Sequence, residues 1–198
     1  SLGLLYDHRN DKAKLAKLVV MQSEVFRDIV DMEKSSLAKR SRKLFTLSAF
    51  YNACADLVDG FATGDLTKDA DFVRNYWEAV AKQFPAWTQV RDGKMLSSEV
   101  REGYIHSHGI ALQALAKVGN ALIRKYPKSW QKRLKSFGSI DWSRSNAKLW
   151  EGRAMTGGRI TKASNNVVLT INVIKSVLGL PLEEDEQRIE DAYKKGRI

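Results

Sequence analysis

The sequence is poor in cysteine, in proline and in long apolar runs, and each shortage excludes a class of protein. Cys54 is the single cysteine, so no internal disulfide can form and nothing indicates an oxidising compartment. No apolar run approaches the roughly 18 residues that a membrane-spanning helix needs. The first residues show neither a basic leader nor a cleavage pattern. We therefore expect a cytoplasmic protein with no membrane partner.

Acidic residues are also scarce, but only in part of the chain. The formal net charge is +10, and residues 1–102 contribute almost none of it, with 16 basic and 15 acidic side chains. Residues 103–182 carry 13 basic side chains against two acidic ones, whereas residues 183–198 carry four basic and six acidic ones. Such segregation predicts an electrostatic footprint for an anionic partner.

Apolar periodicity predicts an all-α fold. Apolar residues make up 43% and charged residues 28% of the chain, which excludes wholesale disorder, and only three prolines leave room for long helices. No stretch alternates convincingly enough for a strand, and no repeat or low-complexity linker divides the chain. We expect a single helical domain over residues 1–198, an irregular bundle of about seven or eight helices.

Capping residues and breakers set the expected helix limits. After an extended lead-in, Asn10 or Asp11 caps a first helix, which polar residues interrupt at 33–43. Thr67 is the expected N-cap of a third helix that Pro85 ends. The helices after the first are expected at residues 44–58, 67–84, 97–126, 129–137, 161 or 164 to 178, and 183–195.

Several residues have predicted packing roles. Cys54 lies in an apolar helical setting, which favours a small buried side chain over a reactive thiol. Gly119 weakens its helix by about 1 kcal/mol relative to alanine, unless it permits close helix packing. Residues 138–158 are expected to be irregular, with Trp142 and Trp150 as packing anchors.

Signatures of catalysis are missing. The sequence contains no phosphate-cradling glycine loop, no HExxH, no paired CxxC and no GxSxG motif, so we expect no enzyme. His106 and His108 invite a metal hypothesis, but residues two apart do not share a helix face. The acidic run at 183–186 is best explained as the first turn of a solvated helix. Neither a metal nor a cofactor is predicted.

The strongest candidate site is a basic stretch that no acid interrupts between residues 103 and 140. Uncompensated charge of this kind is what phosphate binding needs, because released counterions drive the affinity. Four interleaved aromatics either stack on unpaired bases or, as we favour, anchor the core: Tyr126, Trp130, Phe137 and Trp142. The predicted nucleic-acid contacts are Arg124, Lys125, Lys128, Lys132, Arg133 and Lys135.

Two smaller basic patches extend this prediction. The first precedes the second helix, where it opposes the helix dipole unless a phosphate lies nearby; it consists of Lys39, Arg40, Arg42 and Lys43. The second contains Arg159 and Lys162 and follows two glycines into the start of the 161–178 helix, a natural anion site. That helix opens with Ser164, Asn165 and Asn166, residue types that can read base edges.

Five further segments form a recognisable set: residues 1–9 (SLGLLYDHR), 32–37 (MEKSSL), 40–48 (RSRKLFTLS), 109–115 (GIALQAL) and 178–182 (LGLPL). Together they resemble the C-terminal half of the DndB family of bacterial DNA sulfur modification (phosphorothioation) systems. The resemblance implies a DNA-binding transcriptional regulator that represses the modification gene cluster. It also implies an N-terminal half with a DGQHR motif, which this sequence lacks, as a C-terminal fragment does. No DNA-contact residue is carried over from the family.

Double-stranded DNA is accordingly the predicted partner, and a homo-oligomer or other DNA modification proteins are further candidates. One alternative is a protein–protein interaction module in which the charge is secondary. Another is part of a nuclease or nucleotide hydrolase that the missing half completes. A salt-insensitive oligomer without DNA affinity favours the first alternative, and metal-dependent turnover by the full-length protein favours the second.

Overall fold

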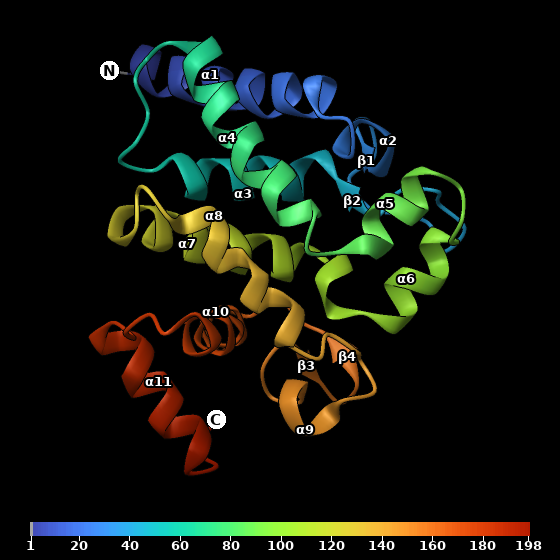
Figure 1. The fold of residues 1–198 in the computed structure, drawn as a ribbon, viewed down its shortest axis with the longest axis vertical. Helices are drawn as coiled ribbons and strands as arrows, with labels where there is room; N and C mark the ends of the chain where they lie inside the picture. The colour runs from blue at the N-terminus through green and yellow to red at the C-terminus, as the bar shows by residue number, and fades with distance from the viewer. Residues whose placement is uncertain (1) are drawn as a thin grey trace.

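The computed structural model describes residues 2–198 and confirms a predominantly helical fold (Figure 1). Within these residues there are eleven α-helices, two 3-10 turns and four two-residue strands. The helix number exceeds the expected seven or eight because two predicted helices are broken by turns and short helices fill segments expected to be loops. The α-helices are α1 (Leu2–Gln22), α2 (Phe26–Ile29), α3 (Leu47–Val58), α4 (Leu66–Ala81), α5 (Pro85–Arg91), α6 (Ser97–Gly103), α7 (Gly109–Lys125), α8 (Trp130–Arg133), α9 (Ala147–Trp150), α10 (Ser164–Leu178) and α11 (Glu184–Lys194).

The molecule is elongated, with α1 at one end of its long axis, α7 in the middle and α11 at the other end (Figure 1). α1 packs on α3 and α4, α3 packs on α7, and α7 packs on α10. α7 is central because it buries side chains on almost every side, including Ile110, Leu112, Leu115 and Leu122. A helix that is apolar nearly all round must lie between neighbours, and this one lies between α3 and α10.

Local capping explains where the first helices begin and end. α1 starts before Asn10, so the expected extended lead-in is helical. Thr46 caps α3 by accepting a hydrogen bond from the Ala49 amide at 3.2 Å. Asp65 caps α4, so the prediction of Thr67 is wrong by two residues. Pro85 does not only follow that helix; it also begins α5, where its missing N–H costs nothing.

The long helix predicted at 97–126 is two helices, α6 and α7, joined by the 3-10 turn Ile105–Ser107. Tyr104 is extended and forms an isolated β-bridge with Ser143, which takes the backbone out of the helix. The buried Ser107 hydroxyl donates to the carbonyls of Val100 and Tyr104, both at 2.9 Å, and so holds the turn. This break places His108 at the beginning of α7.

The segment expected to be irregular contains α9 and the antiparallel strands β3 (Met155–Thr156) and β4 (Arg159–Ile160). Trp142 and Trp150 are buried and stack at 5.4 Å between ring centroids, which confirms both as anchors. The other two strands, β1 (Val30–Asp31) and β2 (Phe45–Thr46), pair in parallel. The prediction of no strands is therefore wrong only for these short pairs, which are too brief to show alternation.

The core is rich in aromatic rings around Phe26, which contacts Phe45, Phe50, Trp77 and Trp87. Cys54 is buried beside them, and burial raises the pKa of its thiol, as expected of a structural cysteine. None of the helices between residues 2 and 198 is both long and apolar enough to cross a membrane.

Two largely buried ion pairs fasten the C-terminal helix. Arg153 binds the Glu190 carboxylate at 2.7 and 2.9 Å, and Lys175 binds Glu186 at 2.7 Å. The acidic run does form the first turn of a helix, with a capping box between Glu183 and Glu186. It is not entirely solvated, because Glu186 also neutralises a lysine that the core covers.

Candidate functional site

The predicted basic stretch lies at the C-terminal end of α7, on α8, and on the 3-10 turn Leu134–Ser139. Its four lysines are exposed, and none pairs with a carboxylate among the described residues: Lys125, Lys128, Lys132 and Lys135. Together they place uncompensated positive charge on the surface formed by the end of α7, α8 and the 3-10 turn. We call them the lysine cluster.

The two arginines of the same stretch have structural contacts. Arg124 donates to the Asn120 side chain at 2.8 Å and to the Asp59 carbonyl at 2.7 Å, which ties α7 to the end of α3. Arg133 lies 3.4 Å from the ring centroid of Tyr126. Both guanidiniums thus have contacts within the protein, although Arg124 is exposed, whereas the four lysines have no such hydrogen bond among the described residues.

The interleaved aromatics pack inward, as favoured from the sequence. Phe137 and Trp142 are buried, and Trp130 packs against Tyr76 at 5.7 Å. Tyr126 is covered by Arg133. Stacking on bases through Phe137 and Trp142 is excluded by their burial.

The patch of Lys39 to Lys43 is held against α6. Arg101 donates to the carbonyls of Ala38 and Lys39 at 3.1 and 2.8 Å, and the Lys43 ammonium donates to the Asp28 carbonyl at 2.9 Å. Arg40 and Arg42 are exposed and line a shallow hollow beside Leu96.

The glycines before α10 do not form the expected anion site. The amides of Gly157 and Gly158 donate to the carboxylate of Glu151, the second at 3.1 Å, so an internal carboxylate already occupies them. Asn166 donates to the carbonyls of Gly152 and Arg153 and is not available to read bases. Arg159 and Lys162, which follow the two glycines, remain exposed.

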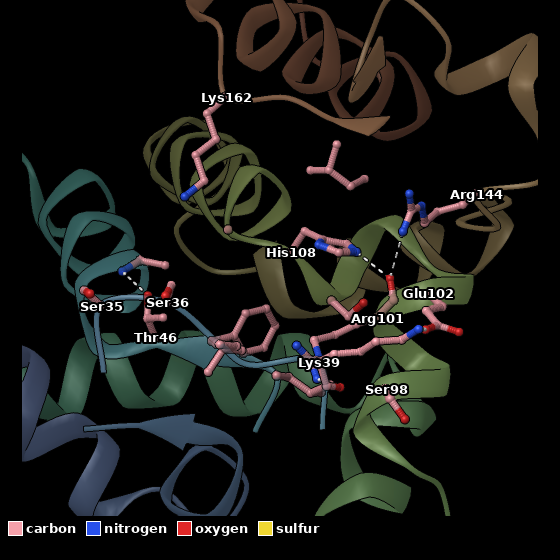
Figure 2. A pocket seen from close by; sticks show the side chains of 17 residues that line it. Ser35, Ser36, Lys39, Thr46, Ser98, Arg101, Glu102, His108, Arg144 and Lys162 are labelled. Atoms are coloured by element: carbon pink, nitrogen blue, oxygen red, sulfur yellow. Dashed lines mark hydrogen bonds and ion pairs between the residues drawn. The ribbon is translucent and has the colours of Figure 1, made fainter. Parts of the chain in front are cut away.

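Folding does join parts of the two smaller patches in one place, a cavity of ≈ 370 Å³ at the start of α7 (Figure 2). Lys39 and Lys162, from opposite ends of the sequence, both line it. Arg101, His108 and Arg144 complete its polar wall. We call these five residues and the space between them the basic pocket.

Three of these residues carry no local sequence signal for an anion site. Arg101 lies beside Glu99 and Glu102, so its neighbourhood has no excess of positive charge, and Arg144 lies in a segment without regular periodicity. His108 has only its spacing from His106 to single it out. The tertiary break before α7 is what brings them to one cavity.

The electrostatics of the basic pocket are strongly positive. Burial, together with the charges of Arg144, Arg101 and Lys162, lowers the pKa of His108 to about 4, so the ring is neutral at pH 7. Its Nε2 lies 2.7 Å from the Arg101 carbonyl and must donate there, because a carbonyl only accepts. Metal binding by the two histidines has no support, since His106 instead accepts a hydrogen bond from Trp87 at 3.2 Å and stacks on Tyr104.

The lysine cluster and the basic pocket are separate. Arg124 and Lys125 end α7, and His108 precedes its first residue. A helix of 17 residues is about 25 Å long. The lysine cluster begins at the end of α7 and follows the chain along α8 and the 3-10 turn, whereas the basic pocket lies at the start of α7, and the two share no residue.

Comparison with known proteins gives one match. The model of the DndB family, described as DNA-sulfur modification-associated, matches residues 1–181. No curated protein and no solved structure matches the chain.

Proposed function

The chain belongs to the DndB family, which is associated with DNA sulfur modification, and from this premise we propose that it binds double-stranded DNA in the bacterial cytoplasm as part of a repressor of the modification genes. On this proposal the domain acts by binding and not by catalysis. The observation that carries the proposal is the lysine cluster. Its four ammonium groups are exposed along the end of α7, α8 and the 3-10 turn, and none has a carboxylate partner among residues 2–198.

The chemistry of these groups suits the DNA backbone. Lys125 is the last residue of α7, Lys128 lies between α7 and α8, Lys132 lies on α8 and Lys135 lies on the 3-10 turn. Each ammonium is a point charge on a flexible stem, which tolerates variation in phosphate position. Contacts of this kind hold the protein on the duplex but carry no sequence information, so they serve affinity and orientation.

The test is binding to a labelled duplex with 5′-hydroxyl ends across a salt series from about 50 to 200 mM. Each phosphate contact contributes about −0.9 to the slope of log K against log salt, so four contacts give roughly −3.6. Changing all four lysines of the cluster to glutamine should remove most of this slope. The matched control carries the same change of net charge at exposed lysines elsewhere: Lys14, Lys17, Lys68 and Lys94.

Salt-dependent binding that the cluster variant loses and the control variant keeps supports the proposal. Equal loss in both variants means that only net charge matters, which contradicts a defined surface. A folded protein that fails to bind at the lowest salt overturns the proposal and favours the interaction-module hypothesis.

A further inference from the structure

We propose that the basic pocket binds a phosphate monoester, the terminal phosphate of a nucleotide or of a DNA strand. This inference goes beyond DNA-backbone binding by the lysine cluster and does not depend on it, because none of the four lysines lines the pocket.

The first support is a convergence of uncompensated charge. Lys39, Arg101, Arg144 and Lys162 come from four separate segments and line one cavity (Figure 2). Among the described residues only Lys39 has a carboxylate within 4.0 Å, that of Glu102 at 3.9 Å, and both side chains are highly exposed. Such a pair adds little, so the pocket keeps an excess of positive charge.

The two guanidiniums are positioned in advance. Arg101 binds the carbonyls of Ala38 and Lys39, and Arg144 binds those of Arg101 and Gly158 at 3.3 and 3.0 Å. These contacts fix the side chains without neutralising them, because a carbonyl carries no net charge. Burial lowers the pKa of Arg101, which shows that its charge is incompletely solvated. A bound anion supplies the missing compensation.

The backbone adds to the same field. Gly109, the first residue of α7, lines the pocket. The helix has no capping side chain and no acidic residue in its first turn, so its amide dipoles favour an anion at this end. Arg101, Arg144 and Lys162 surround that end and already perturb His108, which precedes it.

The charge and the volume of the cavity favour a terminal phosphate over a bridging one. A phosphodiester inside a duplex carries one charge and is flanked by neighbouring sugars, whereas a monoester protrudes and carries close to two charges at pH 7. Four cations against one carboxylate match the greater charge. The volume of ≈ 370 Å³ lies in the range of small-molecule sites. Leu37, Phe45 and Ile160 provide an apolar wall for the attached nucleoside.

The experiment is isothermal titration calorimetry of the whole chain with deoxyadenosine 5′-monophosphate, and with deoxyadenosine as the probe that lacks the phosphate. Lys162→Gln should weaken binding of the monophosphate about fivefold and Arg144→Gln about tenfold, through loss of charge-assisted contacts. Lys162 is exposed, and its ammonium donates no hydrogen bond to residues 2–198. Its variant should therefore fold, which keeps the test informative if Arg144→Gln misfolds. Lys148→Gln, an exposed lysine outside the pocket, is the control.

A second pair of probes separates the two sources of the phosphate. A short single strand with a 5′-phosphate is compared with the same strand ending in a 5′-hydroxyl. Preference for the phosphorylated strand over both the hydroxyl strand and the mononucleotide supports a DNA end as the ligand. Equal binding of strand phosphate and mononucleotide supports a free nucleotide.

No heat with the monophosphate up to about 1 mM, or equal affinity in wild type and Lys162→Gln, overturns the inference. The duplex assay distinguishes this result from failure of the DNA proposal, because pocket variants should leave its salt slope unchanged. Conversely, the lysine-cluster variant should bind the monophosphate normally.

Discussion

Gly119 lies in the middle of the central helix α7, where an alanine would ordinarily stabilise the helix by about 1 kcal/mol. The structure reverses this expectation. A Cβ at position 119 would fall on the ring of Tyr76 from α4, inside any permissible contact distance. The glycine thus makes room for the Tyr76 ring against the backbone of α7.

The magnitude follows from how firmly Tyr76 is held. Its ring is buried against Trp77 and Trp130, with centroid distances of 5.2 and 5.7 Å, and its hydroxyl donates to the Leu115 carbonyl. Overpacking such a site costs about 1–3 kcal/mol. A displaced ring would also leave a buried hydroxyl without its partner, at about 1–3 kcal/mol more. After the helix gain is subtracted, Gly119→Ala should lower the free energy of unfolding by about 3 kcal/mol.

Thermal unfolding followed by circular dichroism measures the effect, with an expected fall in Tm of roughly 6–12 °C. Gly109→Ala in the same helix is the control, since its Cβ would meet only the Ala49 methyl at 3.4 Å. In a Tyr76→Leu background, Gly119→Ala should become neutral or mildly stabilising, because the ring is gone. A single variant Gly119→Ala with a Tm at or above wild type would refute the packing argument.

Three further predictions concern the cap, an ion pair and a buried ring. Asp65→Ala should destabilise the protein by about 1 kcal/mol in urea unfolding, because its carboxylate accepts the Lys68 amide at 3.1 Å, and Thr67→Ala should have little effect. Glu190→Gln should cost roughly 1.5–3 kcal/mol at pH 7 through its contact with Arg153. That contact lowers the pKa of Glu190 in the folded protein. The stabilisation is therefore complete above the unfolded pKa near 4.5 and is lost as the pH falls through the folded pKa, so the stabilities of wild type and variant should converge in acid. Burial lowers the pKa of His106 to about 3, so the imidazole should remain neutral in NMR titration from pH 7 to pH 5. The free energy of unfolding should decline as the pH falls below the ordinary histidine pKa of 6.5, because the unfolded chain then binds a proton that the folded protein does not. A ring that titrates near pH 6.5 in the folded protein contradicts this.

Local patterns gave a good account of the regular parts of the fold. The apolar residues of α3, the glycine that ends α10, and the acidic start of α11 all mark helices close to their observed limits. The burial of Cys54, Trp142 and Trp150 also followed from their surroundings in the sequence. These features succeed because helix periodicity and caps depend on residues only a few positions apart.

The breaks were harder to predict. Nothing in the local pattern marks Tyr104 as extended, because the β-bridge that holds it there comes from Ser143, distant in the sequence. Likewise, Asp65 and Thr67 are both acceptable N-caps, and the contacts of the preceding loop select the first: the Thr63 amide and hydroxyl donate to Asp69 at 2.9 and 2.7 Å. Tertiary contacts decide between local options of nearly equal free energy.

The helical class, the basic and acid-poor third quarter of the chain and the membership of the DndB family all follow from the order of the residues along the chain. Which charges act together follows only from the packing of the helices. The tertiary structure fixed Arg124 and Arg133 in internal contacts, filled the expected glycine anion site with Glu151, and brought Lys39 and Lys162 to one cavity with Arg101. The physical reason is range: helix periodicity is a property of neighbours along the chain, whereas an electrostatic field depends on distances in space that only the packed helices set.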